Sequence, residues 1–181
     1  MDYYRYIEFD EKNGIIPVQN GKNLTSGINV KSTVSGANGV SPNCLTDGAM
    51  LDSSFYFKKS STAATGTPYI LSIDMKRMVL LNEINMATRL VNGSEAAYKY
   101  TIEGSANGKQ YTMLVDGKTN WTVGFLILNI DNRKFVRYLR LRIYGIINVH
   151  TGNAAMWTDG IYEFIAFGRV ETGNMPVLSL N

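Results

Sequence analysis

The residues that most often carry enzymatic chemistry are scarce in this sequence. It holds one histidine, His150, and one cysteine, Cys44. Neither lies in a nucleophile motif such as Gly-x-Ser-x-Gly or in a zinc motif such as His-Glu-x-x-His. The 15 acidic residues leave a pair of catalytic carboxylates open, because any two of them could meet in the fold. The sequence gives no positive sign of catalysis, and we expect that the chain is not an enzyme.

Composition bounds the class of protein and its partners. The chain has 181 residues, of which 45% are hydrophobic and 18% charged, which suits one folded domain. A net charge of +3 without a dense basic run does not suggest nucleic acid as a partner. No apolar run of about 18 residues is present, so no segment is predicted to span a membrane, and a membrane is not expected as a partner. The first residues lack the apolar core of a signal peptide, so any export signal would lie outside this sequence.

The segment from Val136 to Tyr144 shows the clearest structural pattern in the chain. Its apolar residues Leu139, Leu141 and Ile143 alternate with arginine and tyrosine. Successive side chains on a strand point to opposite faces of a sheet, so this segment is predicted to be a half-buried β-strand.

Further strands and turns follow along the chain. Strands are expected at Tyr69–Asp74, Val79–Thr88, Tyr98–Glu103, Tyr111–Val115, Phe125–Ile130 and Ile161–Gly168. Asn-Gly and Asp-Gly pairs separate several of these segments and are typical of tight turns. Many short strands without an amphipathic helix predict an all-β antiparallel sandwich or barrel. We expect this domain to span residues 22–168. Residues 1–21 form an N-terminal extension or the end of a preceding domain, and residues 169–181 form a C-terminal tail.

Several short motifs occur in an order that matches a known family. They are Asn23-Leu24-Thr25-Ser26-Gly27-Ile28-Asn29-Val30, Thr46-Asp47-Gly48, Tyr69–Asp74, Tyr98–Tyr111, Val136–Leu141 and Ile161–Gly168. Together they resemble the coagulation factor 5/8 type C, or discoidin, domain family, whose bacterial relatives include family 32 carbohydrate-binding modules. Met75-Lys76 departs from the pattern, since the family often has Leu-Gly there. The single cysteine excludes the disulfide of many eukaryotic members, which favours the bacterial branch. The resemblance implies a galactose-binding-domain-like jelly-roll β-sandwich.

The resemblance also implies a sugar site in loops at one end of the sandwich. In sugar-binding relatives an arginine after the central strand and a nearby asparagine contact the ligand, and Arg89 and Asn92 resemble that pair. Trp157 would supply an aromatic platform for the C–H face of a sugar ring. Tyr56 and His150 lie in loops that could reach the same end. The alternatives are that Arg89 is a solvated charge and that Trp157 packs beneath its own loop.

The second tryptophan, Trp121, is expected to pack in the core or against its loop.

A structural calcium ion is a further implication of the resemblance. In the family, the aspartate of the Asp-Gly turn and the glutamate of the closing strand often share calcium with loop carbonyls, and these positions match Asp47 and Glu163. Asp52 and Ser53 could add oxygen ligands, which calcium prefers. The alternative is that Asp47 only caps its turn and Glu163 only makes a hydrogen bond or salt bridge.

These features predict a non-catalytic carbohydrate-binding module of a secreted or cell-surface bacterial protein. The location would be extracellular, cell-surface or periplasmic, and the module would be part of a larger multidomain chain. A galactose-like sugar is a candidate ligand. The alternative is an adhesion or interaction domain that binds protein or phospholipid, or a structural spacer. The candidate loops combine arginine, asparagine and one tryptophan rather than paired apolar side chains, which favours a sugar.

Overall fold

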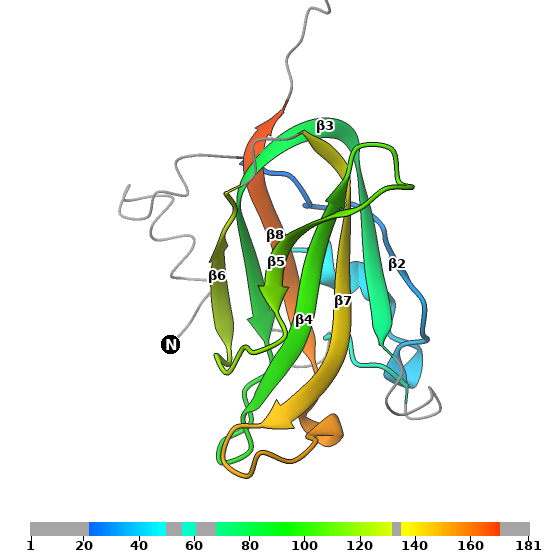
Figure 1. Ribbon diagram of the computed structural model, residues 1–181. Helices are drawn as coiled ribbons and strands as arrows, with labels where there is room; N and C mark the ends of the chain where they lie inside the picture. Colours follow the sequence, from blue (N-terminus) through cyan, green and yellow to red (C-terminus); the bar gives the residue numbers. More distant parts are fainter. Residues whose placement is uncertain (1–21, 50–55, 61–67, 132–134, 171–181) are drawn as a thin grey trace, which may run out of the picture.

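A computed structural model describes residues 22–49, 56–60, 68–131 and 135–170 (Figure 1). The strands are β1 (Lys22–Asn23), β2 (Val30–Ser32), β3 (Tyr69–Thr88), β4 (Ala96–Ser105), β5 (Thr112–Gly117), β6 (Phe125–Asn129), β7 (Val136–Asn148) and β8 (Ile161–Val170). Three short 3-10 helices complete the described part: η2 (Ala37–Gly39), η3 (Pro42–Thr46) and η4 (Met156–Thr158). Every strand pairing is antiparallel. The prediction of an all-β antiparallel jelly-roll sandwich is therefore confirmed.

The long strand β3 joins the two layers of the sandwich. Its first part pairs with β2 and β7, and its last part pairs with β8 and β6. One layer therefore has the order β2-β3-β7-β4-β5, and the other contains β1, β8, β3 and β6. Two sheets packed face to face bury their inner side chains in a shared core.

The continuity of β3 corrects one prediction. Two separate strands were expected at Tyr69–Asp74 and Val79–Thr88, but the structure has one strand that is bent between them. Lys76 has a φ of 61°, and its backbone N–H donates to Asp74 Oδ1 at 2.9 Å. The residues between Asp74 and Val79 therefore form an irregularity within one strand. The pairing with β7 resumes at Val79.

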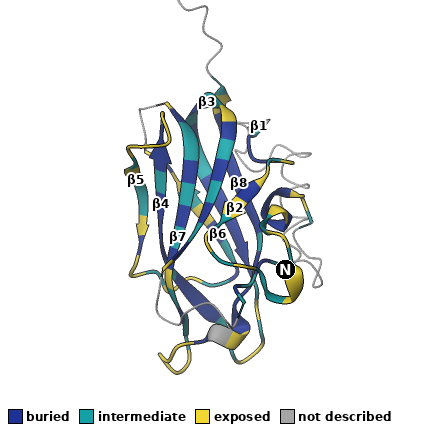
Figure 2. Ribbon diagram, turned by 90° about the vertical axis from the view of Figure 1, so that its right-hand side faces the viewer, coloured by how far each residue is buried: buried dark blue, intermediate teal, exposed yellow. Residues whose placement is uncertain are grey.

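The core follows the alternation of the sequence. Leu139, Leu141 and Ile143 on β7 are buried, and they lie opposite Ile73, Leu71 and Tyr69 on β3. Figure 2 shows the same alternation of buried and partly buried residues along β7, whereas β4 is buried along most of its length. Full burial of each such aliphatic side chain stabilises the fold by about 1.5–3 kcal/mol relative to leaving it exposed.

Trp121 is not a core residue, so the first of its two predicted placements, packing in the core, is wrong. Its side chain is 55% exposed, and the ammonium of Lys99 lies 3.9 Å from the ring centroid. The side-chain amide of Asn120 donates to the carbonyl of Tyr98 at 3.1 Å. This bond anchors the loop on β4 while the neighbouring indole faces solvent.

No helix in the described ranges is both long and apolar enough to cross a membrane.

Candidate functional site

Arg89 connects two loops at one end of the sandwich. Its guanidinium carbon lies 5.1 Å from the ring centroid of Tyr56, within the range of a cation–π contact. Its Nη1 donates to the carbonyl of Trp157 at 3.4 Å, and its backbone N–H donates to the carbonyl of Gly160 at 2.8 Å. The structure thus brings together Tyr56, Arg89 and Trp157, three of the predicted sugar-binding residues.

Trp157 presents a large aromatic surface beside this arginine. It lies in η4, and its side chain is 58% exposed, so the indole does not pack beneath its own loop. The ammonium of Lys58 donates to the carbonyl of Trp157 at 3.1 Å. Two cations therefore surround the backbone of the tryptophan. The structure thus places two cationic donors against the loop that carries the exposed indole.

Two further residues of this cluster were not predicted. Lys58 has no local sequence signal, because its role comes from a contact with a loop 99 residues away. Tyr162 packs edge-on against Tyr56, with ring centroids 5.6 Å apart. β8 is buried along most of its length without alternation, so its pattern does not single out Tyr162 either.

A buried polar network holds the loop that carries Trp157. Asp159 is fully buried, and its carboxylate accepts hydrogen bonds from the Tyr98 hydroxyl at 2.6 Å and from the Lys59 N–H at 3.2 Å. The Gly160 N–H donates to the Tyr98 hydroxyl at 2.6 Å. Burial raises the pKa of Asp159 above its ordinary value. Because buried polar groups are costly when unpaired, this network favours one conformation of the loop.

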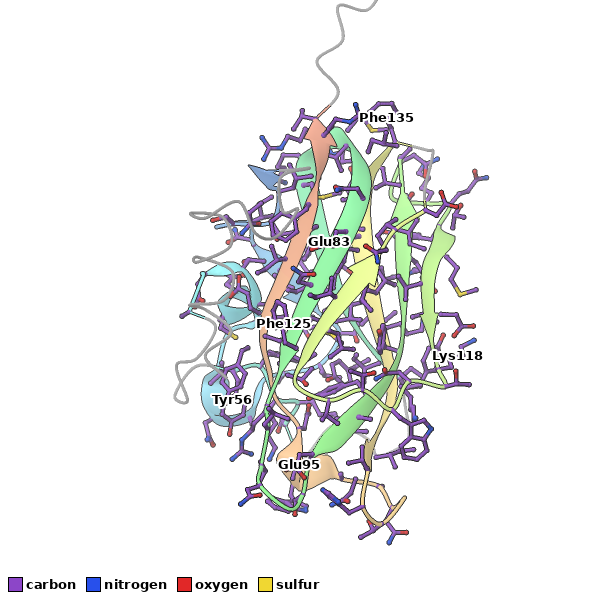
Figure 3. The ribbon with its side chains drawn as sticks, turned by 90° about the vertical axis from the view of Figure 1, so that its left-hand side faces the viewer. Tyr56, Glu83, Glu95, Lys118, Phe125 and Phe135 are labelled. Carbon is purple, nitrogen blue, oxygen red and sulfur yellow. The ribbon has the colours of Figure 1, made fainter. Side chains whose placement is uncertain are left out.

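The predicted residues Asn92 and His150 belong to a neighbouring cluster. Asn92 is exposed in the turn after β3, and Glu95 at the end of that turn accepts from the Gly93 N–H at 3.2 Å. The imidazole of His150 contacts the Glu95 carboxylate, and this contact lowers the pKa of Glu95. Figure 3 shows Glu95 at the same end of the molecule as Tyr56. Ligand contact by Asn92 and His150 stays a prediction.

Asp47 and Glu163 lie close together, as the calcium prediction requires. The Gly48 N–H donates to both Glu163 oxygens, at 3.3 and 3.2 Å. Burial and the negative charge of Asp47 raise the pKa of Glu163 to about 8. Asp47 Oδ1 also accepts from the Ala49 N–H at 2.8 Å, as a turn residue would.

The donor chemistry of this pair fits a hard cation. A buried carboxylate beside a second carboxylate is destabilised unless it takes up a proton or a cation joins the pair. Asp52 and Ser53, the other predicted ligands, lie outside the described residues. The described part of the chain contains no group of three or more histidine, cysteine, aspartate or glutamate side chains that could hold a metal ion. Within the described residues, the further oxygen ligands available to an ion here are backbone carbonyls, and calcium accepts them.

Comparison with known proteins identifies the architecture. No protein-family model and no curated protein matches this chain. Among solved structures, CpGH89CBM32-4 of Clostridium perfringens, in complex with GlcNAc-α-1,4-galactose, matches with a TM-score of 0.63 and 16% identity over 82% of this chain and 95% of that chain. Chitosan-binding module 1 of a chitosanase/glucanase from Paenibacillus sp. IK-5 matches with a TM-score of 0.60 and 17% identity over 81% of this chain and 99% of that chain.

The chain has the fold of these carbohydrate-binding modules. A second Clostridium perfringens module, CpGH89CBM32-5 in complex with GalNAc-β-1,3-galactose, has a TM-score of 0.62 and 14% identity over 81% of this chain and 100% of that chain. A family 89 glycoside hydrolase from the same organism matches over 87% of this chain but only 16% of its own length. The carbohydrate-binding-module fold is thus found both alone and within a much larger enzyme.

Proposed function

We propose that this chain is a non-catalytic carbohydrate-binding module that binds a glycan through Tyr56, Arg89 and Trp157. The observation that carries the proposal is the exposed indole of Trp157, on a loop whose Trp157 backbone carbonyl accepts from the Arg89 guanidinium, at one end of a carbohydrate-binding-module fold. An exposed aromatic face suits the C–H side of a sugar ring, and planar donors suit its hydroxyl groups.

The arginine retains donors for a ligand. A guanidinium carries five N–H groups in a fixed plane, and one nitrogen of Arg89 serves the Trp157 carbonyl. Stacking on Tyr56 restrains the plane, so little side-chain entropy remains to be lost on binding. The Lys58 ammonium, which donates to the carbonyl of Trp157, adds a second cationic donor at the same loop.

A galactose-containing glycan is the first candidate ligand. Two of the similar structures are complexes with disaccharides that contain galactose. The proposal places the module outside the cytoplasm of a bacterium and within a larger chain. It is supported by similar bacterial modules, and by the hydrolase in which this fold forms a small part.

A structural calcium ion held by Asp47 and Glu163 completes the proposal. When bound, the ion would neutralise the two carboxylates and join the turn after η3 to β8. The buried Glu163 carboxylate and its neighbour of like charge support this assignment.

A glycan array followed by calorimetric titration tests the sugar site. Loop sites bury little ligand surface, so we expect dissociation constants on the order of 0.1–1 mM. Trp157→Ala should abolish detectable binding. Trp121→Ala is the matched control, since that tryptophan is equally exposed on another surface, and it should leave this binding unchanged. Sedimentation with anionic liposomes tests the alternative. Binding to vesicles with no binding to any glycan would overturn the proposal.

A further inference from the structure

One face of the molecule combines aromatic rings with cations in a repeated arrangement. We call the solvent side of the β2-β3-β7-β4-β5 layer the outer face; Figure 2 shows its strands β5, β4, β7 and β2. Four rings on it each lie against a cation: Tyr111 with Arg140 at 3.8 Å, Trp121 with Lys99 at 3.9 Å, Tyr138 with Arg137 at 5.0 Å and Tyr144 with Lys118 at 5.2 Å. Such pairs restrain the orientation of each ring and keep the charge close to apolar surface.

Two of the carboxylates of the outer face are already neutralised. Asp74 accepts from Arg137 at 2.8 Å and from Lys76 at 3.0 Å. Glu103 lies 2.5 Å from Arg140 and 3.6 Å from Arg142. Each of these two acids is thus shared by two cations. Because each carboxylate is matched by two cations, these ion pairs leave an excess of positive charge on the outer face.

Three lysines add to the surplus. Lys31, Lys99 and Lys118 have no carboxylate partner among the described residues. The cations of the outer face are Lys31, Lys76, Lys99, Lys118, Arg137, Arg140 and Arg142, and its carboxylates are Asp74, Glu103 and Asp116. Seven positive and three negative groups leave an excess of four, although the whole chain has a net charge of only +3. The positive charge is therefore concentrated on this face.

A groove at one end of the outer face has room for a single sugar ring. It encloses about 440 Å³ between β2, β3 and the loop after β4. Tyr111 and Tyr138 form aromatic walls. The polar groups of the lining come from Asn29, Lys31, Ser72 and the ion pair of Asp74 with Lys76. The groove thus supplies aromatic surface, hydrogen-bonding groups and an unpaired cation together. A sugar ring bearing a carboxylate or sulfate requires this combination.

We propose that the outer face binds an acidic polysaccharide, with one sugar in the groove beside Lys31 and the chain continuing along β7 toward Trp121. Tyr138 and Tyr144 are six residues apart on β7, which corresponds to roughly 20 Å of strand. That length accommodates several sugar units. This surface is separate from the loop-end site, so the inference extends the proposed function without depending on it.

Binding to polymers of stated chemistry tests the inference. The probes are hyaluronan, chondroitin sulfate and polygalacturonate, with dextran as the neutral polysaccharide. The wild-type chain should bind at least one acidic polymer at least tenfold more tightly than dextran, and the affinity should fall as salt is raised because exposed charges are screened. Lys31→Glu and Trp121→Ala should each weaken this binding at least fivefold. Trp157→Ala should not change it, which distinguishes failure here from failure of the loop-end site.

A charge-matched variant separates a local site from general attraction. Arg169 is exposed at the end of β8, in the other layer, and Arg169→Glu changes the net charge by the same amount as Lys31→Glu. It should have less than a twofold effect. Equal losses for the two variants would overturn the inference, as would absence of binding to all three acidic polymers. Tighter binding to polyglutamate or to oligo(dT) than to any acidic polysaccharide would also overturn it.

Discussion

Arg89 lies between two partners, the ring of Tyr56 and the carbonyl of Trp157. A lysine would keep the charge but lose the planar set of donors. We therefore expect Arg89→Lys to weaken glycan binding nearly as much as Arg89→Ala, by tenfold or more in calorimetric titration. Loss of the cation–π contact should lower the free energy of unfolding by only about 0.5–1 kcal/mol. Full binding by Arg89→Lys would show that positive charge alone is needed at this position.

Tyr98 acts on the site through the loop that carries Trp157. Tyr98→Phe removes the hydroxyl that donates to Asp159 and accepts from Gly160. Two buried polar groups lose their partner, so the free energy of unfolding in urea should fall by about 1–3 kcal/mol. Glycan affinity should fall as well, at temperatures where the variant remains folded.

Tyr162→Phe is the control for this substitution, because the Tyr162 hydroxyl makes no hydrogen bond within the described part of the chain. It should change the stability by less than about 0.5 kcal/mol. Equal effects of the two substitutions would contradict the role given to the network.

At the scale of elements, the bend of β3 depends on the backbone of Lys76. Its φ of 61° lies in the left-handed region, which asparagine tolerates and β-branched residues do not. Lys76→Val should therefore be less stable than Lys76→Asn by about 1–2 kcal/mol in chemical denaturation. Both variants lose the same ion pair with Asp74, so their difference reports the backbone. Equal stabilities would mean that the bend relaxes without cost.

At the scale of the whole molecule, a calcium ion between η3 and β8 would act on global stability. An ion that binds only the folded state stabilises it by about 2.7 kcal/mol at a hundredfold excess over its dissociation constant. Chelation should therefore lower the melting temperature of the wild type, measured by calorimetry. Glu163→Gln should respond much less. An unchanged melting temperature, with no metal in elemental analysis, would leave Asp47 as a turn residue only.

The pH dependence in chelator follows from the same carboxylate. The pKa of Glu163 rises from 4.5 to about 8 in the folded chain. Between these values the native state binds more protons than the unfolded state, so the contribution of Glu163 to stability falls as pH rises. The free energy of unfolding, measured in chelator, should decline over this interval more steeply for the wild type than for Glu163→Gln. Parallel profiles would contradict the raised pKa.

The sequence by itself determined the architecture, because the information needed is local. Alternation of apolar and polar residues gives the faces of β7 and β4, and turn dipeptides mark where strands end. Leu139, Leu141 and Ile143 are buried as predicted.

The tertiary structure alone decided which loop residues meet. Arg89 and Trp157 are 68 positions apart, and Tyr98 and Asp159 are 61 apart. Their contacts depend on strand register and loop path, which periodicity does not encode. The exposure of Trp121 also came from tertiary contacts, because Asn120 anchors that loop on β4. The cation–π pairs of the outer face form only when three adjacent strands and their loops come together. A charge count along the sequence gives a net charge of +3 and does not show where on the fold the positive charge lies.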